Sequence, residues 1–247
     1  MYQTAEVVVC GAGIAGIATA YYLATQHGIT NILLVDPHPP LSQTTAKSGE
    51  NYRNWWPNSS MVDFANRSID LMEQIADHTD NVMQMERRGY LYVSTNPSKA
   101  NLPVLGQHTQ ATGESFLLRS HPERNGTPGS LYDPMPQGHF SKHPNGADIL
   151  YGKELIQKWY PYLAKIIKTA LHVRRAGRIS VQQLGMYMLE VAKNSGVKLL
   201  VGNVVDIKCK GEQVTSVCVE VKGKIRDVHS GSFVNAAGPF AASVAET

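Results

Sequence analysis

The sequence predicts a mixed α/β fold organised around a strand–helix–strand unit at its N-terminus. Residues 7–9 are three valines, whose β-branched side chains suit a strand that is buried on both faces. Apolar residues then recur with a helical period over residues 14–23, and Gly28 stands where a helix commonly ends. A second apolar strand, residues 32–35, ends on Asp36. This order of elements is typical of a parallel α/β unit.

Three glycines with the spacing G-x-G-x-x-G lie between the first strand and the helix. Gly11 allows a tight turn, Gly13 lets a phosphate approach the backbone because it has no Cβ, and Gly16 lets the helix pack closely against the strand. The N-terminus of the helix adds unpaired N–H groups and the positive end of a dipole. Asp36, 20 residues after Gly16 (36 − 16), can accept hydrogen bonds from both ribose hydroxyls of an adenosine. The unit therefore predicts a dinucleotide site, and its carboxylate argues against NADP because it would repel a 2′-phosphate.

The composition is that of an ordinary globular protein. The 247 residues suffice for one large domain or two small ones, and 43% of them are hydrophobic and 17% charged. The net charge of +3 and the isolated pairs Arg87-Arg88 and Arg174-Arg175 argue against a nucleic-acid partner. No apolar run reaches the ~20 residues that span a bilayer. We also see no secretory signal at the N-terminus.

The cysteines and histidines give no sign of a metal site. Cys10, Cys209 and Cys218 form no metal-binding spacing, and the nine histidines are scattered along the chain. Cys10 is most simply a small buried apolar group beside the glycines. Three cysteines of this kind fit a reducing compartment. We therefore expect no metal ion and a cytoplasmic location.

Residues 41–57 form a second informative segment. They are rich in small and hydroxyl-bearing side chains, which let a backbone lie along a cofactor and donate hydrogen bonds to it. Ligand contacts concentrate on loops that follow a dinucleotide-binding unit. We favour this cofactor-binding interpretation; the alternative is a surface loop whose Trp55 and Trp56 fill a core.

The remainder of the chain predicts further helices and strands around a long irregular segment. Residues 96–146 are rich in Pro, Gly, His and Asn with little periodicity, which is typical of a loop-rich second domain or an insertion. The last strand closes on Ala236-Ala237-Gly238, where two backbones, or a backbone and a ligand, can approach each other. The chain stops nine residues after Gly238 (247 − 238), so we expect an incomplete fragment. Three further helices are predicted: one that follows the cap Ser59–Ser60, one over 153–159 and one over 180–194. The predicted strands span 90–94, 197–208, 214–221 and 225–229, with another strand within 164–174 and a last one that starts at 233.

Taken in order, these motifs resemble the FAD-dependent amine and amino-acid oxidoreductases, the group of glycine oxidase, D-amino-acid oxidase and sarcosine oxidase. The resemblance covers essentially the whole chain and implies a glutathione-reductase-type FAD-binding Rossmann domain with an inserted mixed β-sheet substrate domain, the C-terminal part being missing. It implies a first FAD-binding part over 1–80, a substrate-side insertion over 81–175 and a return segment over 176–247. The motifs are V-V-V-C-G-A-G-I-A-G, Asp36, T-T-A-K-S-G, R-R-G-Y-L-Y-V, R-A-G-R-I-S, V-G-N-V-V-D-I and N-A-A-G-P.

The resemblance also implies which residues contact FAD. The glycine turn would bind the pyrophosphate and Asp36 the ribose. The loop 45–49 would run along the pyrophosphate toward the isoalloxazine, and the backbone of Val204 would contact the adenine end. Residues 236–238 would approach the cofactor from a second side. No histidine lies between His38 and His78, so we expect FAD to be non-covalent in this part of the chain. The implied cofactor-binding residues are Gly11, Ala12, Gly13, Ile14, Ala15, Gly16, Asp36, Thr45, Lys47, Ser48, Gly49, Val204, Ala236, Ala237 and Gly238.

The activity that the resemblance implies is oxidation of the C–N bond of a small amino acid or a secondary or tertiary amine, such as sarcosine or glycine, to an imine. Arg53 is a candidate to bind the substrate carboxylate through a bidentate contact. Lys47 is a candidate to place positive charge near the flavin. The alternatives are an ordinary ion pair for Arg53 and a solvated loop side chain for Lys47.

Two other functions stay open at this point. A flavoprotein of the same fold could serve as a regulatory or assembly subunit without turnover. An NAD-dependent dehydrogenase is a third possibility, against which the loop after Asp36 and the closing N-A-A-G argue. The expected partner is a small amine or amino acid; the electron acceptor and any oligomeric state are open.

Overall fold

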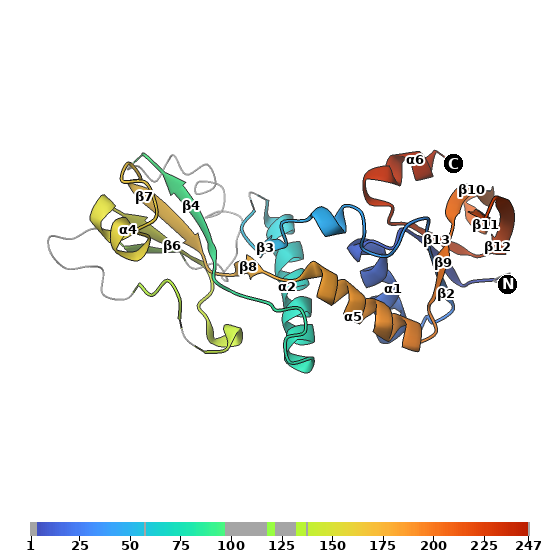
Figure 1. Ribbon diagram of the computed structural model, residues 1–247, viewed down its shortest axis with the longest axis horizontal. Coiled ribbons are helices and arrows are strands. Elements are labelled where there is room, and N and C mark those ends of the chain that lie inside the picture. Colours follow the sequence, from blue (N-terminus) through green and yellow to red (C-terminus); the bar gives the residue numbers. More distant parts are fainter. Residues whose placement is uncertain (1–3, 57, 97–117, 122–131, 137, 247) are drawn as a thin grey trace. The chain divides into compact units, whose positions relative to one another are not determined.

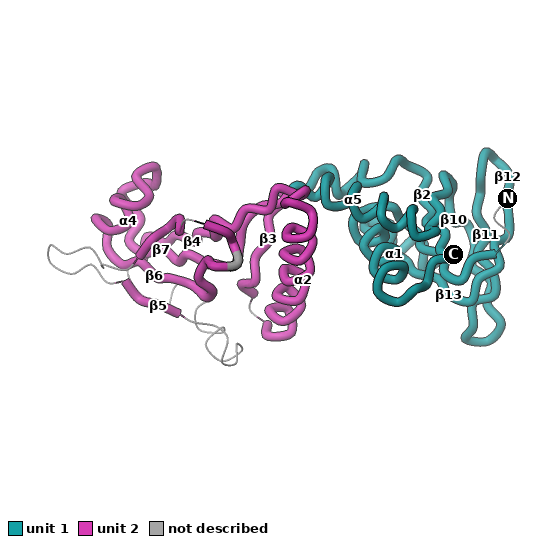
Figure 2. Tube along the Cα trace, turned by 90° about the horizontal axis from the view of Figure 1, so that it is seen from below, with its two compact units in different colours: residues 1–49, 180–247 teal, residues 50–179 magenta. Residues whose placement is uncertain are grey.

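The computed structural model describes residues 4–56, 58–96, 118–121, 132–136 and 138–246. Much of the expected irregular segment 96–146 lies outside these residues. The chain divides into two compact units, residues 1–49 with 180–247, and residues 50–179 (Figure 2). The first unit therefore contains both ends of the chain, and the second is an insertion.

The predicted domain boundaries at 80/81 and 175/176 differ from this division. The first boundary differs because the helix α2 (Ser59–His78) belongs to the inserted unit. Arg175 donates hydrogen bonds to Asp70 and Glu73 of α2 at 2.5 and 2.8 Å, so this helix is tied to residues near the end of the insertion. The insertion also begins earlier, at residue 50.

The first unit contains a four-stranded parallel sheet with the strand order β13-β1-β2-β9 (Figure 1). The central strand β1 is buried along its whole length, as three consecutive valines predict. The helices α1 and α5 lie side by side and contact each other. The strands are β1 (Val7–Cys10), β2 (Ile32–Asp36), β9 (Lys198–Val201) and β13 (Ser232–Asn235), and the helices are α1 (Ile14–His27) and α5 (Val181–Asn194).

The end of α1 and the start of α5 are both capped. Gly28 ends α1 in the left-handed conformation, with φ of 68°, and its N–H donates to Leu23 O. Ser180 begins α5, and its side chain accepts a hydrogen bond from Gln183 N. The expected C-terminal cap of α1 is thus confirmed, and α5 begins one residue later than predicted because Ser180 is its N-cap.

A three-stranded antiparallel sheet completes the first unit. Its strands are β10 (Asn203–Lys210), β11 (Gln213–Val221) and β12 (Lys224–His229), in that order. The single strand expected over 197–208 is wrong, because β9 and β10 lie in different sheets. They separate at Gly202, whose N–H donates to Asp36 O at 3.1 Å and where a Cβ would lie 2.9 Å from Glu220 O.

After β13 the chain forms a short 3-10 helix (Gly238–Phe240) and the helix α6 (Ala241–Ala245). Pro239 lies in the first turn of the 3-10 helix, where its missing N–H costs no hydrogen bond.

The inserted unit is built on a four-stranded mixed sheet with the order β4-β7-β6-β5. The strand β6 was not predicted. The helix α2 begins at Ser59, within the expected cap Ser59–Ser60, because Asn58 caps it and accepts from Ser60 N at 2.9 Å. The strands are β4 (Tyr90–Ser94), β5 (Leu118–His121), β6 (Ala147–Tyr151) and β7 (Thr169–Val173); the other elements are β3 (Asn51–Arg53), β8 (Ala176–Arg178), α2 and α4 (Lys153–Trp159).

The two faces of this mixed sheet carry separate apolar clusters. On one face Leu150 and Ala170 pack with Leu155 and Ile156 of α4. On the other face Ile149, Leu171 and Trp55 form a cluster, with Tyr92 and Tyr151 at its edge. The alternation along β6 and β7 produces this division, because successive side chains point to opposite faces.

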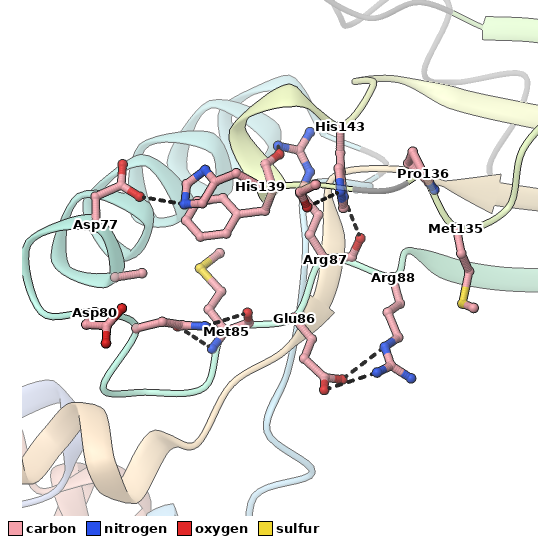
Figure 3. A pocket seen from close by; sticks show the side chains of 14 residues that line it. Asp77, Asp80, Met85, Glu86, Arg87, Arg88, Met135, Pro136, His139 and His143 are labelled. Carbon is pink, nitrogen blue, oxygen red and sulfur yellow. Dashed lines mark hydrogen bonds and ion pairs between the residues drawn. The ribbon is translucent and has the colours of Figure 1, made fainter.

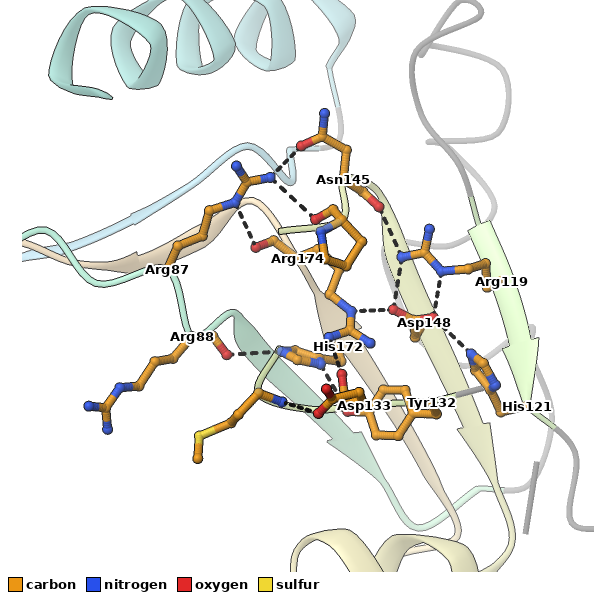
Figure 4. Close-up of polar contacts among 12 residues, drawn as sticks. Arg87, Arg88, Arg119, His121, Tyr132, Asp133, Asn145, Asp148, His172 and Arg174 are labelled. Carbon is orange, nitrogen blue, oxygen red and sulfur yellow. Dashed lines mark hydrogen bonds and ion pairs between the residues drawn. The ribbon is translucent and has the colours of Figure 1, made fainter. Parts of the chain in front are cut away.

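A buried polar cluster centres on Asp148 of β6 (Figure 4). Arg119 donates to both carboxylate oxygens at 2.7 and 2.9 Å, Arg174 Nε donates to Oδ2, and His121 Nε2 hydrogen-bonds with Oδ1 at 2.8 Å. Burial by itself would raise the pKa of Asp148, but these hydrogen bonds outweigh it and hold the pKa well below its usual range. Asp148 is therefore an ionised, fully partnered carboxylate.

Three arginines of this region hold the segment that precedes β6 (Figure 4). Arg174 donates to Asp133 O at 2.7 Å, and Arg119 donates to Asn145 O at 2.9 Å. Arg87 donates to Phe140 O and Pro144 O at 3.2 and 3.3 Å. Buried carbonyl groups outside helices and sheets need such donors, so the guanidinium groups replace the missing backbone hydrogen bonds.

Replacing Asp148 by Asn tests the weight of this cluster. The change removes the charge that compensates Arg174, whose side chain is 6% exposed, so we expect a loss of about 3–5 kcal/mol in unfolding free energy. Urea unfolding followed by tryptophan fluorescence measures it, since Trp55, Trp56 and Trp159 all lie in the inserted unit. Asp63→Asn, on the exposed side of α2, is the control; equal unfolding midpoints for the two variants would contradict the expectation.

Candidate cofactor site

The first unit contains a cavity of about 530 Å³ at the carboxyl ends of its parallel strands. Four stretches that are far apart in the sequence line it: the glycine turn after β1, the loop after β2, and the segments around residues 203–204 and 236–244. Ligands of open α/β sheets bind at this edge, outside the carboxyl ends of the strands.

The glycine turn brings three backbone segments together. Gly11 has φ of 107°, and a Cβ on it would lie 2.7 Å from the carbonyl carbon of Ala236. Ala236 N donates to Cys10 O at 2.8 Å, so this approach is fixed by a hydrogen bond. A Cβ on Gly16 would overlap Gly11 O. The turn and packing roles expected of Gly11 and Gly16, and the close backbone approach expected at Ala236, are confirmed.

The N-terminus of α1 opens into the cavity at Gly13. A Cβ there would meet a single neighbour, Thr45 Oγ1 at 3.3 Å, so the space beside Gly13 is largely free. Thr45 Oγ1 accepts a hydrogen bond from Ile14 N at 3.2 Å. The N–H groups of Gly13 and Ala15 have no acceptor among the residues that the structure describes. The helix end thus offers free donors and the positive end of its dipole.

Asp36 lies at the rim of the cavity and is held by two backbone groups. Ala12 N donates to Oδ2 at 2.7 Å, and His38 N donates to Oδ1 at 2.8 Å. Each carboxylate oxygen keeps a further lone pair for a ligand hydroxyl. Burial and the charge of Asp36 raise the pKa of the Cys10 thiol to about 11, so this cavity-lining thiol stays protonated.

The loop after β2 is fastened over the glycine turn through Leu41. Its N–H donates to Ala12 O at 2.9 Å, and its carbonyl accepts from Gln182 Nε2 at 3.1 Å. The side chain is 1% exposed and fills the space above Gly185, where a Cβ would lie 2.7 Å from Leu41 Cδ1. Leu41 has φ of 61°, a conformation that costs about 1–3 kcal/mol in a non-glycine residue. Its burial and hydrogen bonds offset that cost.

The charge of the cavity wall is uneven. Among the described residues that line it, Asp36 is the only acid and there is no lysine or arginine. A negatively charged ligand group would therefore be stabilised by the helix N-terminus, by backbone N–H groups and by hydroxyl groups of the wall, and not by a lysine or arginine.

The structure gathers most of the predicted cofactor residues around this cavity. Ala12 and Gly16 are buried behind the wall, and Lys47, Ser48 and Gly49 are exposed and do not line it. Residues that sequence reasoning missed also line it: His38 and Pro39 directly follow the predicted acid, whereas Phe240 and Ser243 carried no signal. The predicted residues in the wall are Gly11, Gly13, Ile14, Ala15, Asp36, Thr45, Val204, Ala236, Ala237 and Gly238.

The two predicted catalytic residues lie in different units. Lys47 ends an exposed 3-10 helix (Thr45–Lys47) of the first unit. Arg53 ends β3 of the inserted unit, and its guanidinium carbon lies 4.5 Å from the ring centre of Trp56 and 5.5 Å from that of Tyr90. Arg53 Nε is buried and has no hydrogen-bond partner among the described residues.

Arg53 also changes the environment of Tyr92 on β4. Burial raises the pKa of Tyr92, and the charge of Arg53 together with its hydrogen bond opposes that rise. The guanidinium is thus held among three aromatic side chains, and one N–H direction is left free.

No helix among the described residues is both long and apolar enough to cross a bilayer.

Comparison with known proteins gives a consistent result. Residues 6–247 match the family model of the FAD dependent oxidoreductases. Sarcosine oxidase subunit beta of Arthrobacter sp is 33% identical over 90 residues, which are 35% of this chain and 21% of that protein.

Solved structures share the fold over the entire chain. L-proline dehydrogenase of P. horikoshii is 17% identical with a TM-score of 0.75, and glycine oxidase of Bacillus cereus ATCC 14579 is 19% identical with a TM-score of 0.70. The chain covers 56% and 59% of these two structures, so it spans little more than half of their length. The predicted α/β fold class, a Rossmann-like parallel sheet with an inserted mixed sheet, is confirmed. With the family model matched from residue 6 to the last residue, this chain belongs to the FAD dependent oxidoreductases.

Proposed function

We propose that the cavity of the first unit binds the adenosine diphosphate part of FAD. The observation that carries this proposal is the space beside Gly13, which a side chain would fill and which faces the free N–H groups of the α1 N-terminus. A diphosphate placed there accepts hydrogen bonds from backbone donors and lies at the positive end of the helix dipole. Because the family uses FAD, the NAD-dependent dehydrogenase considered from the sequence is set aside.

Asp36 would bind the ribose of the adenosine. The two backbone hydrogen bonds fix its carboxylate, and the remaining lone pairs can accept the 2′- and 3′-hydroxyls. A 2′-phosphate would meet this negative charge with no cation in the described wall to compensate it. The Thr45 hydroxyl accepts from Ile14 N, so its own proton is free to be donated to a phosphate oxygen.

We further propose that the protein to which this chain belongs oxidises the C–N bond of a small amino acid or a secondary or tertiary amine to an imine. FAD, when bound, supplies the acceptor for the two electrons that leave the substrate. Arg53 would bind the substrate carboxylate, because its guanidinium is held by stacking and its Nε–H lacks an acceptor. We also propose that Lys47, Ser48 and Gly49 lie along the bound FAD toward its flavin ring, as the resemblance implies.

The competing proposal is a flavoprotein subunit of the same fold without turnover. The match to a protein named as a subunit favours keeping this alternative. The two proposals share the FAD site and differ in whether a bound substrate reduces the flavin.

Replacing Gly13 by Val tests the FAD site. The side chain would occupy the space intended for the diphosphate, so we expect FAD binding to fall below detection while the thermal melting of the apoprotein changes little. Gly231→Val is the control, because no atom lies within 4 Å of a Cβ at that glycine. Equilibrium dialysis with FAD measures binding; full loading of the Gly13 variant would remove the assignment.

Anaerobic addition of substrate separates the enzyme from the non-catalytic subunit. With the complete protein loaded with FAD, sarcosine, glycine and other small secondary and tertiary amino acids are added one at a time. We expect at least one of them to bleach the flavin absorbance, because oxidation of the amine transfers two electrons to it. Unchanged spectra with all of them would support the subunit without turnover.

Replacing Arg53 by Lys tests the carboxylate contact. Lysine keeps the charge but loses the planar fork and the stacking, so we expect KM for the amino acid that bleaches the flavin to rise about tenfold or more, with a smaller change in kcat. Arg178→Lys, exposed on the adjacent strand β8, is the matched control. An unchanged KM in the Arg53 variant would assign the carboxylate contact to another residue.

A further inference from the structure

A second cavity, of about 550 Å³, lies within the inserted unit (Figure 3). Its wall consists of the end of α2, the residues that follow this helix up to 88, and residues of the stretches 135–136 and 138–143. Its volume is in the range of small-molecule sites. None of the residues named so far for FAD or for the substrate belongs to its wall.

The floor of this cavity is apolar and buried. Ala76 is 2%, Met85 3% and Phe140 8% exposed. In Figure 3 the thioether of Met85 extends toward the ring of His139. The rings of His139 and Phe140 lie against each other, with their centres 4.1 Å apart and their planes tilted by 34°. The floor therefore suits alkyl groups rather than a fully hydrated ion.

The walls are held by hydrogen bonds before any ligand arrives. Asn81 Oδ1 accepts from Met85 N at 2.7 Å and its Nδ2 donates to Met85 O at 3.2 Å, which closes the turn after α2. On the other side, His143 Nε2 hydrogen-bonds with Gly138 O at 3.1 Å, and Arg87 holds Phe140 O. A preformed cavity loses less conformational entropy on binding.

The charges around the cavity favour a cation. Three carboxylates line it, those of Asp77, Asp80 and Glu86. Glu86 forms an ion pair with Arg88 at 3.3 Å, and Asp77 contacts His139 at 3.2 Å. The carboxylate of Asp80 has no partner among the described residues and is drawn without a contact in Figure 3. The guanidinium of Arg87 donates instead to Glu73 and to loop carbonyls.

The cation that fits is organic. The described residues contain no group of three His, Cys, Asp or Glu side chains arranged to hold a metal ion. A bare metal ion would also gain nothing from the methionine and phenylalanine floor. We propose that this cavity binds a small alkylammonium ion, with its nitrogen next to Asp80 and its alkyl groups against Met85 and Phe140. The proposal goes beyond FAD binding and does not depend on it.

Methionine methyl groups provide a site-specific test. The protein carries eight methionines, of which Met85 and Met135 line the cavity and Met186 lies exposed in the first unit. In the complete protein labelled with ¹³C at the methionine methyl groups, choline is titrated and the methyl signals are followed. We expect saturable shifts at Met85 and Met135, assigned through their Leu variants, and none at Met186.

Two comparisons test the recognition of charge. The neutral isostere 3,3-dimethyl-1-butanol should shift the two signals much less than choline. Asp80→Asn should weaken choline binding about threefold or more, and Asp63→Asn should leave it unchanged. Asn is well tolerated at position 80, where φ is 50°, so this variant should fold normally.

Several outcomes would overturn the proposal: no saturable shift, equal shifts with the neutral isostere, an unaffected Asp80→Asn variant, or shifts with magnesium ions in place of choline. The titration is run with and without FAD. Failure to bind FAD would contradict the proposed cofactor site and would leave the methyl shifts as they are, so the two proposals fail separately.

Discussion

The first unit depends on one close approach of backbone to backbone. Gly11, Gly16 and Ala236 meet where a single Cβ would overlap a carbonyl group. This contact places β13 beside β1 and seats α1 on the turn, so it fixes both the sheet order and the position of the helix N-terminus. The cavity is a consequence, since its wall needs the segments after β1, after β2 and after β13 at the same edge.

The two units use different groups to stabilise charge. The cavity of the first unit has one fixed acid and no lysine or arginine in its described wall, so an anion there depends on the N–H groups of the helix and backbone and on neutral side-chain donors. The inserted unit instead buries Asp148 with Arg119 and Arg174 and uses arginines to hold an irregular segment. Backbone donors suit a ligand that must always be bound in one place, because they cannot rotate away. Arginine side chains suit a segment with few backbone hydrogen bonds of its own.

Local signals explain which parts the sequence could predict. The helix α1, the strand β2 and the acid Asp36 could be predicted because the glycines, the helix cap and the apolar pattern all lie within a short stretch of sequence. All three appear where expected. The break at Gly202 was missed because the apolar pattern runs through it, and the separation comes from the packing of Gly202 beneath Glu220. The partners of Asp148 are 26 to 29 residues away, so no spacing rule could identify them.

The way the insertion begins and ends explains why it can exist as a unit. Its first and last strands, β3 and β8, pair with each other, and Ile179 N donates to Glu50 O at 3.0 Å. The chain therefore enters and leaves the insertion at one place. Glu86 closes this base by exchanging backbone hydrogen bonds with Arg178 at 2.8 and 3.0 Å.

Gly177 makes that closure possible, because a Cβ there would overlap Glu86 O. Any side chain at Gly177 must then separate residue 86 from β8. Residues 85–88 also line the second cavity, and Arg87 among them donates to Phe140 O. The same displacement would therefore disturb the segment that precedes β6, which Arg87 holds. The absence of a side chain at Gly177 is thus needed both for the pairing at the base of the insertion and for the position of the residues that line the second cavity.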